Sequence, residues 1–160
     1  MAKINAGDEV PDVTVLLDDG PVRLHDFIGQ RNVVLYFYPK DGSYVCVLEA
    51  RAFNDQVDAF AAADTLVIGV SMDSRASHAR FAAKEKLRFP LGTDPDRVLV
   101  HAFDASNHLV LGIAAKRVTF LIGKDGRIAR VWDTVNPLTH SRDVLDAVHA
   151  LVDAEHAAAS

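Results

Sequence analysis

Three unbroken runs of apolar and β-branched residues lie along the chain, at residues 32 to 38, 65 to 71 and 117 to 122. Such runs, without polar alternation, are typical of strands that are covered on both faces of a sheet. A weaker alternation at residues 13 to 17 predicts a further short strand ahead of them. The pattern therefore predicts a buried sheet whose strands are widely separated in the sequence.

Between these runs the apolar residues recur at spacings of three and four, the period of a helix that is buried on one side. This spacing predicts helices over residues 45 to 63, 75 to 87 and 141 to 154, and a shorter helix over residues 96 to 103. Ser74 precedes the second of these helices and is the expected N-cap. Helices therefore alternate with the predicted strands.

A turn at residues 123 to 126 connects the last apolar run to a strand expected at residues 128 to 132, which together form a hairpin. Strands that alternate with helices run parallel, and a hairpin adds an antiparallel edge. The order predicts an α/β, thioredoxin-like fold, in which helices flank a central mixed β-sheet and an N-terminal extension precedes it. The length fits one domain over residues 1–160. An apolar stretch at residues 109 to 113 is expected to pack in the core, with the mouth of a substrate site or a dimer contact as the alternatives.

The formal net charge is −5, from 17 Lys and Arg against 22 Asp and Glu. An acidic balance without a basic run disfavours nucleic acid and anionic membranes as partners. No apolar stretch reaches the length of a membrane span, and the N-terminus lacks the apolar segment of a secretion signal. The expected location is the cytoplasm.

Cys46 is the only cysteine, which excludes an internal disulfide, a multi-cysteine metal site and a Cys-x-x-Cys redox pair. It lies after a predicted buried strand, in the first turn of the next helix, where unpaired N–H groups stabilise a thiolate. A lone cysteine is also typical of simple core packing, and its neighbours Val45 and Val47 are apolar. From the residues alone, a reactive thiol and a packing residue both remain open.

The seven histidines form no metal-binding motif, so we expect neither a metal nor another cofactor. Solvated or capping roles are the default expectation for these side chains.

Four segments carry a resemblance to a known family: residues 37 to 41, which read F-Y-P-K-D, and residues 70 to 74, 89 to 94 and 117 to 122. With Cys46 following the first segment, they resemble the peroxiredoxins. The most similar subfamily is peroxiredoxin Q, also called bacterioferritin comigratory protein, whose usual active segment reads F-Y-P-K-D-x-T-P-G-C-T-x-E. The similarity runs from about residue 4 to residue 151.

The resemblance implies a role for each matching residue. Cys46 matches the peroxidatic cysteine, Ser43 the family's threonine, and Arg117 the arginine beside the thiolate. Pro39 matches the proline that shields the thiolate from water, and Glu49 a glutamate that orients the arginine. Each supporting residue also has an ordinary explanation, as a helix cap, a surface ion pair or a strand stop.

The implied activity is that of a thiol peroxidase, which reduces hydrogen peroxide, and organic hydroperoxides as a further substrate class, through a sulfenic acid on Cys46. The Ser43 hydroxyl, the Arg117 guanidinium and nearby backbone N–H groups are expected to donate to the oxygens. The alternatives are a non-catalytic thioredoxin-fold binding module and a redox sensor based on Cys46.

The sequence departs from the family pattern around the cysteine. Tyr44 and Val45 replace proline and glycine, and Val47 replaces a threonine. Arg51 stands where many relatives carry a resolving cysteine. We therefore expect a one-cysteine mechanism, in which an external thiol, either a small molecule or a thioredoxin-like protein, reduces Cys46. The subfamily resemblance implies a monomer or a weak dimer.

Overall fold

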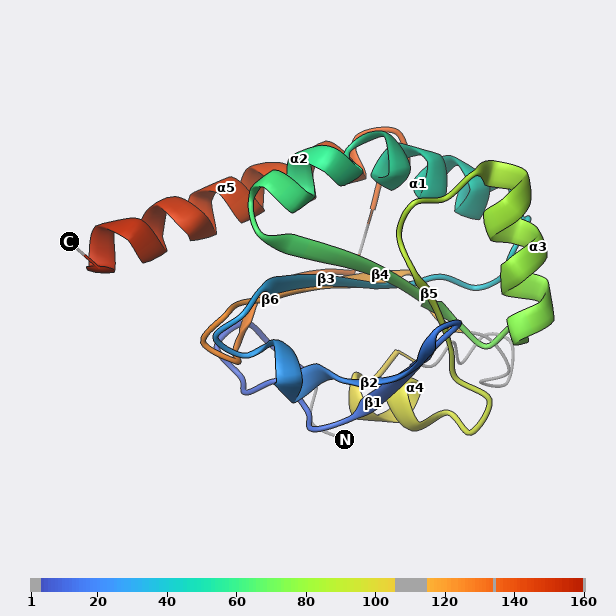
Figure 1. The fold of residues 1–160 in the computed structure, drawn as a ribbon, viewed down its shortest axis with the longest axis horizontal. Coiled ribbons are helices and arrows are strands. Elements are labelled where there is room, and N and C mark those ends of the chain that lie inside the picture. The colour runs from blue at the N-terminus through green and yellow to red at the C-terminus, as the bar shows by residue number, and fades with distance from the viewer. Residues whose placement is uncertain (1–3, 106–114, 134, 160) are drawn as a thin grey trace.

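A computed structural model of the chain describes residues 4–105, 115–133 and 135–159. These residues form a seven-stranded mixed sheet in the order β2-β1-β5-β4-β3-β6-β7 (Figure 1). The strands are β1 (Thr14–Leu17), β2 (Gly20–Arg23), β3 (Asn32–Phe37), β4 (Thr65–Ser71), β5 (Leu91–Thr93), β6 (Val118–Ile122) and β7 (Ile128–Trp132). The three long apolar runs of the sequence are the central strands β3, β4 and β6, as predicted.

Strand pairing follows the predicted mixture of parallel and antiparallel neighbours. β3 pairs with β4 in parallel, and β4 pairs with β5 in parallel. β6 pairs antiparallel with both β3 and β7, which confirms the hairpin. In this register Phe37, the last residue of β3, lies opposite Val118, the first residue of β6. Residues that follow β3 and residues that precede β6 therefore meet at one end of the sheet.

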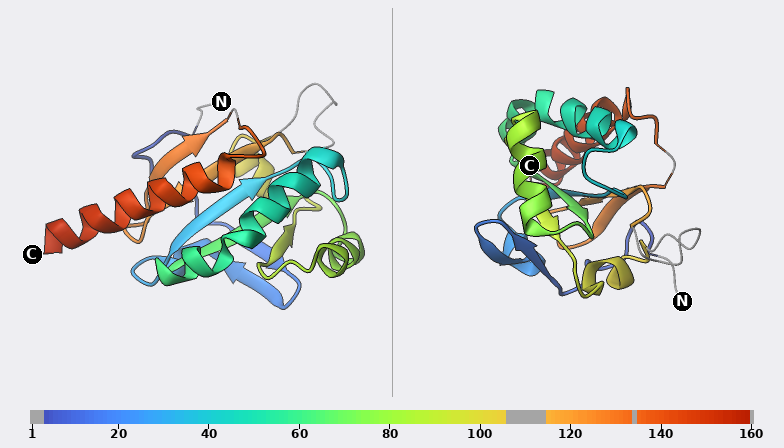
Figure 2. Two further views of the ribbon diagram at one scale, coloured as in Figure 1. Left: turned by 90° about the horizontal axis from the view of Figure 1, so that it is seen from above. Right: turned by 90° about the vertical axis from the view of Figure 1, so that its right-hand side faces the viewer.

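Helices cover one face of the central strands, whereas the β1–β2 edge of the sheet and the short helices η1 and α4 lie toward the other side (Figures 1 and 2). The helical face carries α1, α2, α3 and α5, and α5 extends past the end of the sheet. The helices are η1 (Leu24–Phe27), α1 (Tyr44–Asp55), α2 (Val57–Ala62), α3 (Arg75–Glu85), α4 (Val98–Ala102) and α5 (His140–Ala159). Ser74 caps α3 as predicted, because its Oγ accepts a hydrogen bond from the Ser77 N–H at 3.1 Å.

The central strands divide their side chains between two apolar clusters, since alternate residues of a strand face opposite sides. Val33, Leu35 and Phe37 pack on the side of the β1–β2 hairpin and α4. Val34 and Tyr36 face the helices, in the cluster that also contains Cys46. The cysteine thus lies on the helical side of the sheet, within an apolar cluster that is rich in aromatic side chains.

Several boundaries differ from the expectation. The helix predicted over residues 45 to 63 is broken at Gln56, whose φ of −102° and ψ of 2° end α1 and start α2. β2, β5 and η1 were not predicted, because each has only three or four residues and lacks a periodic pattern. α5 continues to Ala159, five residues beyond its expected end. The apolar stretch at residues 109 to 113 lies outside the described residues.

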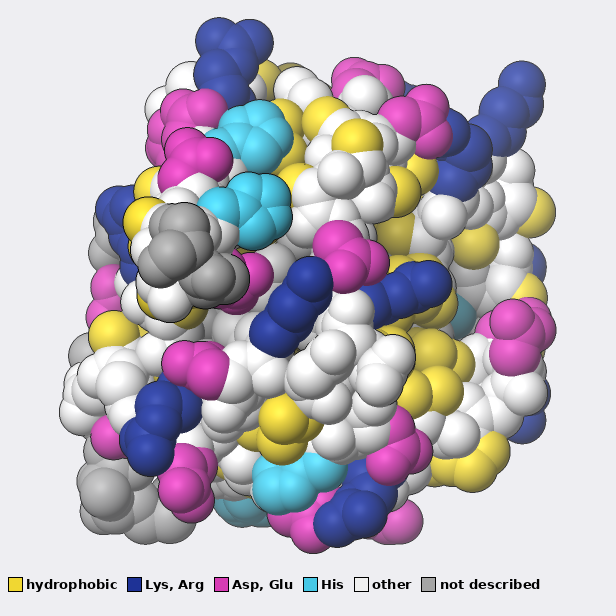
Figure 3. Space-filling view, turned by 60° about the vertical axis from the view of Figure 1, so that its left-hand side comes forward, with side chains coloured by type: hydrophobic (Ala, Val, Ile, Leu, Met, Phe, Trp, Pro, Cys, Tyr) yellow, Lys and Arg dark blue, Asp and Glu magenta, His cyan; other side chains and the backbone are white. Residues whose placement is uncertain are grey.

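The side of the molecule that carries the end of α5 mixes acidic and basic side chains over its surface (Figure 3). No helix within the described ranges is both long enough and apolar enough to cross a membrane.

Gly92 in β5 tests how closely the edge of the sheet packs. A Cβ placed there would lie 2.5 Å from Val15 Cγ1 on β1, closer than atoms tolerate. We expect Gly92→Ala to lower the free energy of unfolding by about 1–3 kcal/mol, as measured by denaturant titration. In a double-mutant cycle, Val15→Ala should recover part of this loss because it removes the clashing methyl group. Strictly additive losses would contradict the clash.

Candidate active site

Cys46 lies near the start of α1, close to the end of β3. The chain leaves β3, turns through Gly42 with a φ of +76°, and enters the helix after Ser43. The first helical hydrogen bond runs from the Val47 N–H to the Ser43 carbonyl at 2.9 Å. The N–H groups from Tyr44 to Cys46 precede that bond, so they have no acceptor within the helix and carry the positive end of its dipole. The sulfur therefore sits where backbone dipoles favour negative charge.

Arg117 brings a full positive charge to the same sulfur. It directly precedes β6, one position outside the strand where we had expected it, and so reaches the end of β3. Its Nη2 donates to Cys46 Sγ at 3.4 Å, and its Nη1 donates to Glu49 Oε1 at 3.0 Å. The structure thus brings together Cys46, Glu49 and Arg117, as the resemblance implied.

Burial makes these charges interact strongly. Cys46 and Glu49 are each 1% exposed, and the Arg117 side chain is 21% exposed. Burial raises the pKa of Glu49 to about 7, although the charge and hydrogen bond of Arg117 oppose the rise. Burial lowers the pKa of Arg117, but its interactions with Cys46 and Glu49 outweigh this and raise it overall. Arg117 is therefore held as a cation between two groups that can each become anions.

Ser43 is the N-cap residue of α1, but its hydroxyl does not cap the helix. The Oγ donates its hydrogen to the Lys40 carbonyl at 3.1 Å. A hydroxyl has one hydrogen and two lone pairs, so this Oγ presents acceptor sites and not the donor that we expected. It can accept a hydrogen bond from a protonated oxygen near Cys46.

The other two residues singled out in the sequence take different places. Pro39 is half-buried in the bend that directly follows β3, so it lies where the strand ends. Arg51 is exposed on α1 and forms an ion pair with Glu85 at the end of α3. Arg51 is therefore a link between two helices.

The departures from the family pattern cause no visible distortion of the backbone. Tyr44 and Val45 lie inside the first turn of α1, and the left-handed conformation in this segment falls on Gly42. Tyr44 is 79% exposed and Val45 is 37% exposed. These two apolar side chains therefore face solvent next to the buried sulfur.

Sequence reasoning missed a buried tyrosine beside the site. Tyr36 lies behind the sulfur in the same apolar cluster, and burial raises the pKa of its hydroxyl, with the charges of Glu49 and Cys46 adding to the rise. The Tyr36 hydroxyl and Glu49 Oε2 are buried without a hydrogen-bond partner among the described residues. Only the strand period, which places Tyr36 on the helical face, could have indicated it.

Two histidines are buried, so the expectation of solvated or capping roles is wrong for them. His140 is 2% exposed, and its Nε2 lies 2.8 Å from Thr119 Oγ1. Burial lowers its pKa to about 4, which Asp143 opposes and Arg117 reinforces. Its ring packs edge-on against Phe53 and Trp132. His78 is buried in a separate polar network.

Glu49 gives the stability of the protein a dependence on pH. Because its pKa is about 7 when folded, against 4.5 for a free group, the folded state binds the proton more tightly. This contribution is fully present below the unfolded value and is lost as the pH rises from 4.5 to 7. We expect the free energy of unfolding of wild type, relative to Glu49→Gln, to fall by about 1–3 kcal/mol over that window.

The measurement is a series of denaturant titrations at pH values across the window. Asp146→Asn, at an exposed position of α5, serves as the control for a change of one charge. A flat difference between wild type and Glu49→Gln would show that Glu49 does not titrate there.

Comparison with known proteins identifies the family. The model of the AhpC/TSA family matches residues 6–131. The peroxiredoxin Bcp of Bacillus subtilis is 37% identical over 150 residues, which cover 91% of this chain and 95% of the relative. The peroxiredoxin Bcp of Xanthomonas campestris is 39% identical over 124 residues, covering 74% and 76%.

Solved structures agree with the sequence matches. A mutant of Xylella fastidiosa PrxQ superposes with a TM-score of 0.85 at 34% identity, over 94% of this chain and 98% of the other. The Xanthomonas campestris bacterioferritin comigratory protein, described for its alkyl peroxide reduction activity, gives 0.84 at 33% identity, over 92% and 99%. The predicted thioredoxin-like fold is thereby confirmed. The chain belongs to the AhpC/TSA family, as a peroxiredoxin-type thiol peroxidase that reduces peroxides.

Proposed function

We propose that Cys46 is the sulfur that reduces the peroxide, that Arg117 and the first N–H groups of α1 stabilise the charges involved, and that an external thiol completes the cycle. The observation that carries the proposal is the hydrogen bond from Arg117 to the Cys46 sulfur at 3.4 Å. Burial alone disfavours an anionic sulfur, so a guanidinium donating to it at this place favours a reactive thiolate over a packing residue.

The chemistry requires a thiolate and fixed donors. The thiolate attacks one peroxide oxygen, an S–O bond forms, the O–O bond breaks, and the leaving alkoxide or hydroxide takes a proton from water. Negative charge moves from sulfur to oxygen during this step, so Arg117 and the backbone N–H groups stabilise the transition state. Ser43 accepts a hydrogen bond from the peroxide proton and orients the oxygen that is attacked. Pro39 and Glu49 act as supporting residues, the one restricting water and the other holding the guanidinium.

The reduction half of the cycle needs a second molecule. The chain has a single cysteine, so the sulfenic acid on Cys46 condenses with an external thiol, releasing water and forming a mixed disulfide. A second thiol then displaces Cys46 as the thiolate. The sum is one peroxide and two thiols converted to an alcohol, a water molecule and a disulfide. Exposed Tyr44 and Val45 next to the sulfur offer a small apolar contact for the reductant.

The central experiment is rapid mixing of the reduced protein with one equivalent of hydrogen peroxide, followed by trapping with dimedone and mass spectrometry. We expect a dimedone adduct on Cys46 and reaction far faster than that of a free thiol. Cys46→Ser should be inert. Oxidation at the rate of a free thiol would defeat the proposal and would return the binding-module and sensor interpretations to consideration.

Arg117→Ala should slow the peroxide reaction by about a hundredfold or more, because it removes a charged donor from the transition state. The thiolate should also form only at higher pH, which ultraviolet absorbance of the sulfur measures. Arg142→Ala, at an exposed position of α5, is the matched control. Because the variant leaves Glu49 without its cation, its folding must be verified by thermal unfolding. An unaltered thiolate titration in the folded variant would remove Arg117 from the site.

Ser43→Ala should slow the same reaction by about tenfold to a thousandfold while leaving thiolate formation nearly unchanged. The hydroxyl touches the peroxide in our proposal, whereas its loss costs the helix no cap. Ser43→Thr should retain the rate. A rate within about twofold of wild type for Ser43→Ala would limit Ser43 to its bond with Lys40.

A further inference from the structure

A buried histidine–aspartate hydrogen bond links α3 to the turn that carries the site. His78 in α3 is 6% exposed, and both of its ring nitrogens face oxygen acceptors. Nδ1 lies 2.7 Å from Asp41 Oδ2, and Nε2 lies 2.9 Å from the Gly92 carbonyl oxygen. The histidine thus connects β5 behind it to the segment between β3 and α1.

The acceptors determine where the protons are. A carbonyl oxygen can only accept, so Nε2 carries a hydrogen that it donates to Gly92. A proton must also lie between Nδ1 and the Asp41 carboxylate, since two bare acceptors at 2.7 Å would repel. Nδ1 and the Asp41 carboxyl group therefore share one proton, and both ring nitrogens of His78 are hydrogen-bonded.

The surroundings of Asp41 support the ionised form. Its Oδ1 accepts from the Tyr38 hydroxyl at 2.7 Å, and its Oδ2 accepts from Ser77 Oγ at 2.8 Å in addition to His78. Burial acts to raise the pKa of Asp41, but the hydrogen bonds from His78, Tyr38 and Ser77 outweigh burial and lower it. The backbone N–H of Asp41 donates to Asp73 Oδ2 at 2.8 Å. Both the side chain and the main chain of Asp41 are thus fixed.

Fixing Asp41 fixes the residues that touch the peroxide in our proposal. Asp41 lies between Lys40, whose carbonyl receives the Ser43 hydroxyl at 3.1 Å, and the left-handed turn at Gly42. This turn also determines where α1 starts and therefore where its first N–H groups point. His78 has no contact with Cys46 of its own, so any effect on the reaction passes through this turn.

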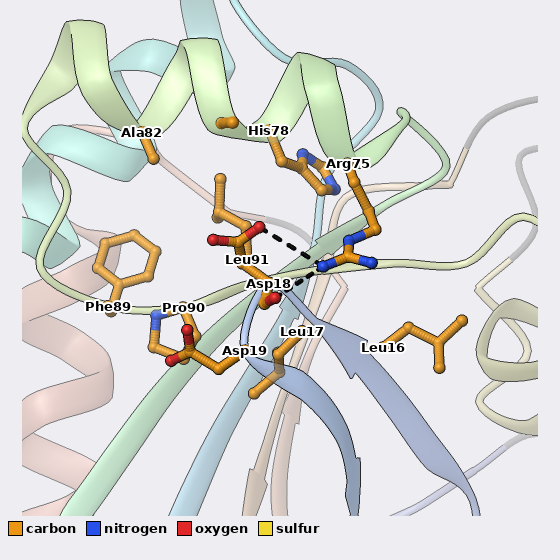
Figure 4. A pocket seen from close by; sticks show the side chains of 11 residues that line it. Leu16, Leu17, Asp18, Asp19, Arg75, His78, Ala82, Phe89, Pro90 and Leu91 are labelled. Carbon is orange, nitrogen blue, oxygen red and sulfur yellow. Dashed lines mark hydrogen bonds and ion pairs between the residues drawn. The ribbon is translucent and has the colours of Figure 1, made fainter.

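The outer side of His78 is accessible from a surface pocket of about 200 Å³ between the β1–β2 turn, α3 and β5 (Figure 4). In that view His78 and Arg75 both extend from α3 toward the pocket. Arg75 is paired with Asp18 across the pocket mouth, through its carbonyl at 2.7 Å and its carboxylate at 3.8 Å. The guanidinium of Arg75 therefore interacts with Asp18, whereas Asp41 interacts with His78.

We propose that His78, through Asp41, is a positioning residue for peroxide reduction, because it holds the turn that places the Ser43 hydroxyl and the start of α1 around Cys46. This inference rests on the proposed function. It assigns to the reaction a residue from α3 that lies outside the segment recognised in the sequence.

The test compares two reactions of the same sulfur. Hydrogen peroxide needs the positioned hydroxyl and N–H groups, whereas iodoacetamide, a neutral alkylating reagent, needs only the thiolate. At a pH where the thiolate is fully formed, His78→Ala should slow the peroxide reaction by about tenfold or more. The iodoacetamide rate should remain within about threefold of wild type, since ionisation is complete and no oxygen is bound.

Asp41→Asn provides the conservative rescue. Its amide nitrogen can donate both to Nδ1 of a neutral His78 and to Ser77 Oγ, and its oxygen can still accept from Tyr38. The turn then keeps its hydrogen bonds, with the direction of the Ser77 bond reversed. We expect a peroxide rate within about threefold of wild type for this variant. His149→Ala, exposed on α5, controls for loss of a histidine. If His78→Ala does not fold, Ser77→Ala removes another donor to the same carboxylate and should slow the peroxide reaction by about twofold to fivefold.

The outcomes distinguish failure of the proposed peroxidase function from failure of the positioning role of His78. A wild-type protein that reacts with peroxide no faster than a free thiol defeats the proposed function itself. A fast wild type with an equally fast, folded His78→Ala defeats only the positioning role. Equal losses in both reactions would assign His78 to thiolate formation or general stability, and a loss in Asp41→Asn as deep as in His78→Ala would contradict the hydrogen-bonded link.

Discussion

The site depends on one guanidinium that is shared by two acidic groups. Arg117 donates to the Cys46 sulfur through one nitrogen and to the Glu49 carboxylate through another, in a place where little solvent competes. Each contact restrains the other, since the single hydrogen bond from Nη1 to Glu49 limits how far Nη2 can move from the sulfur. The antiparallel pairing of β6 with β3 makes this possible, because it brings together residues that are 71 positions apart.

This arrangement leaves polar atoms without hydrogen bonds, as far as the described residues go, in the apolar cluster that contains Cys46, which costs free energy of folding. Glu49 Oε2 and the Tyr36 hydroxyl are buried without partners among the described residues, and each such group costs free energy. A protein retains buried polar atoms of this kind where the surrounding packing outweighs their cost. Here the ring of Tyr36 stacks on Phe53 with centroids 4.7 Å apart, which anchors β3 to α1 directly behind the sulfur. Within the described part of the chain, Tyr36 thus lacks a hydrogen bond at its hydroxyl but makes aromatic contact through its ring.

Much of this could be predicted from the sequence, and the reasons for the exceptions are physical. Strands β3, β4 and β6 were predictable because an uninterrupted run of apolar residues is typical of a strand buried on both faces. The position of Cys46 was predictable because it follows the end of such a run. The meeting of Arg117 with Cys46 required the family resemblance, since no local pattern encodes a contact between distant segments. The break at Gln56 and strand β5 escaped prediction because tertiary packing decides them. His78 escaped because a buried histidine and an exposed one look identical in a sequence until both of its acceptors are known.

The burial of Cys46 also affects the timing of the catalytic cycle. A small peroxide needs little room beside a sulfur that is 1% exposed, whereas a bulky thiol must approach the sulfur along the axis of the bond it forms. In the proposed cycle such a thiol would need more room than the folded first turn of α1 leaves beside the sulfur, and local opening of that turn would provide it. The rate of that opening would then determine how long the sulfur stays oxidised in the proposed cycle, and so how long excess oxidant has to convert it to the irreversible sulfinic state.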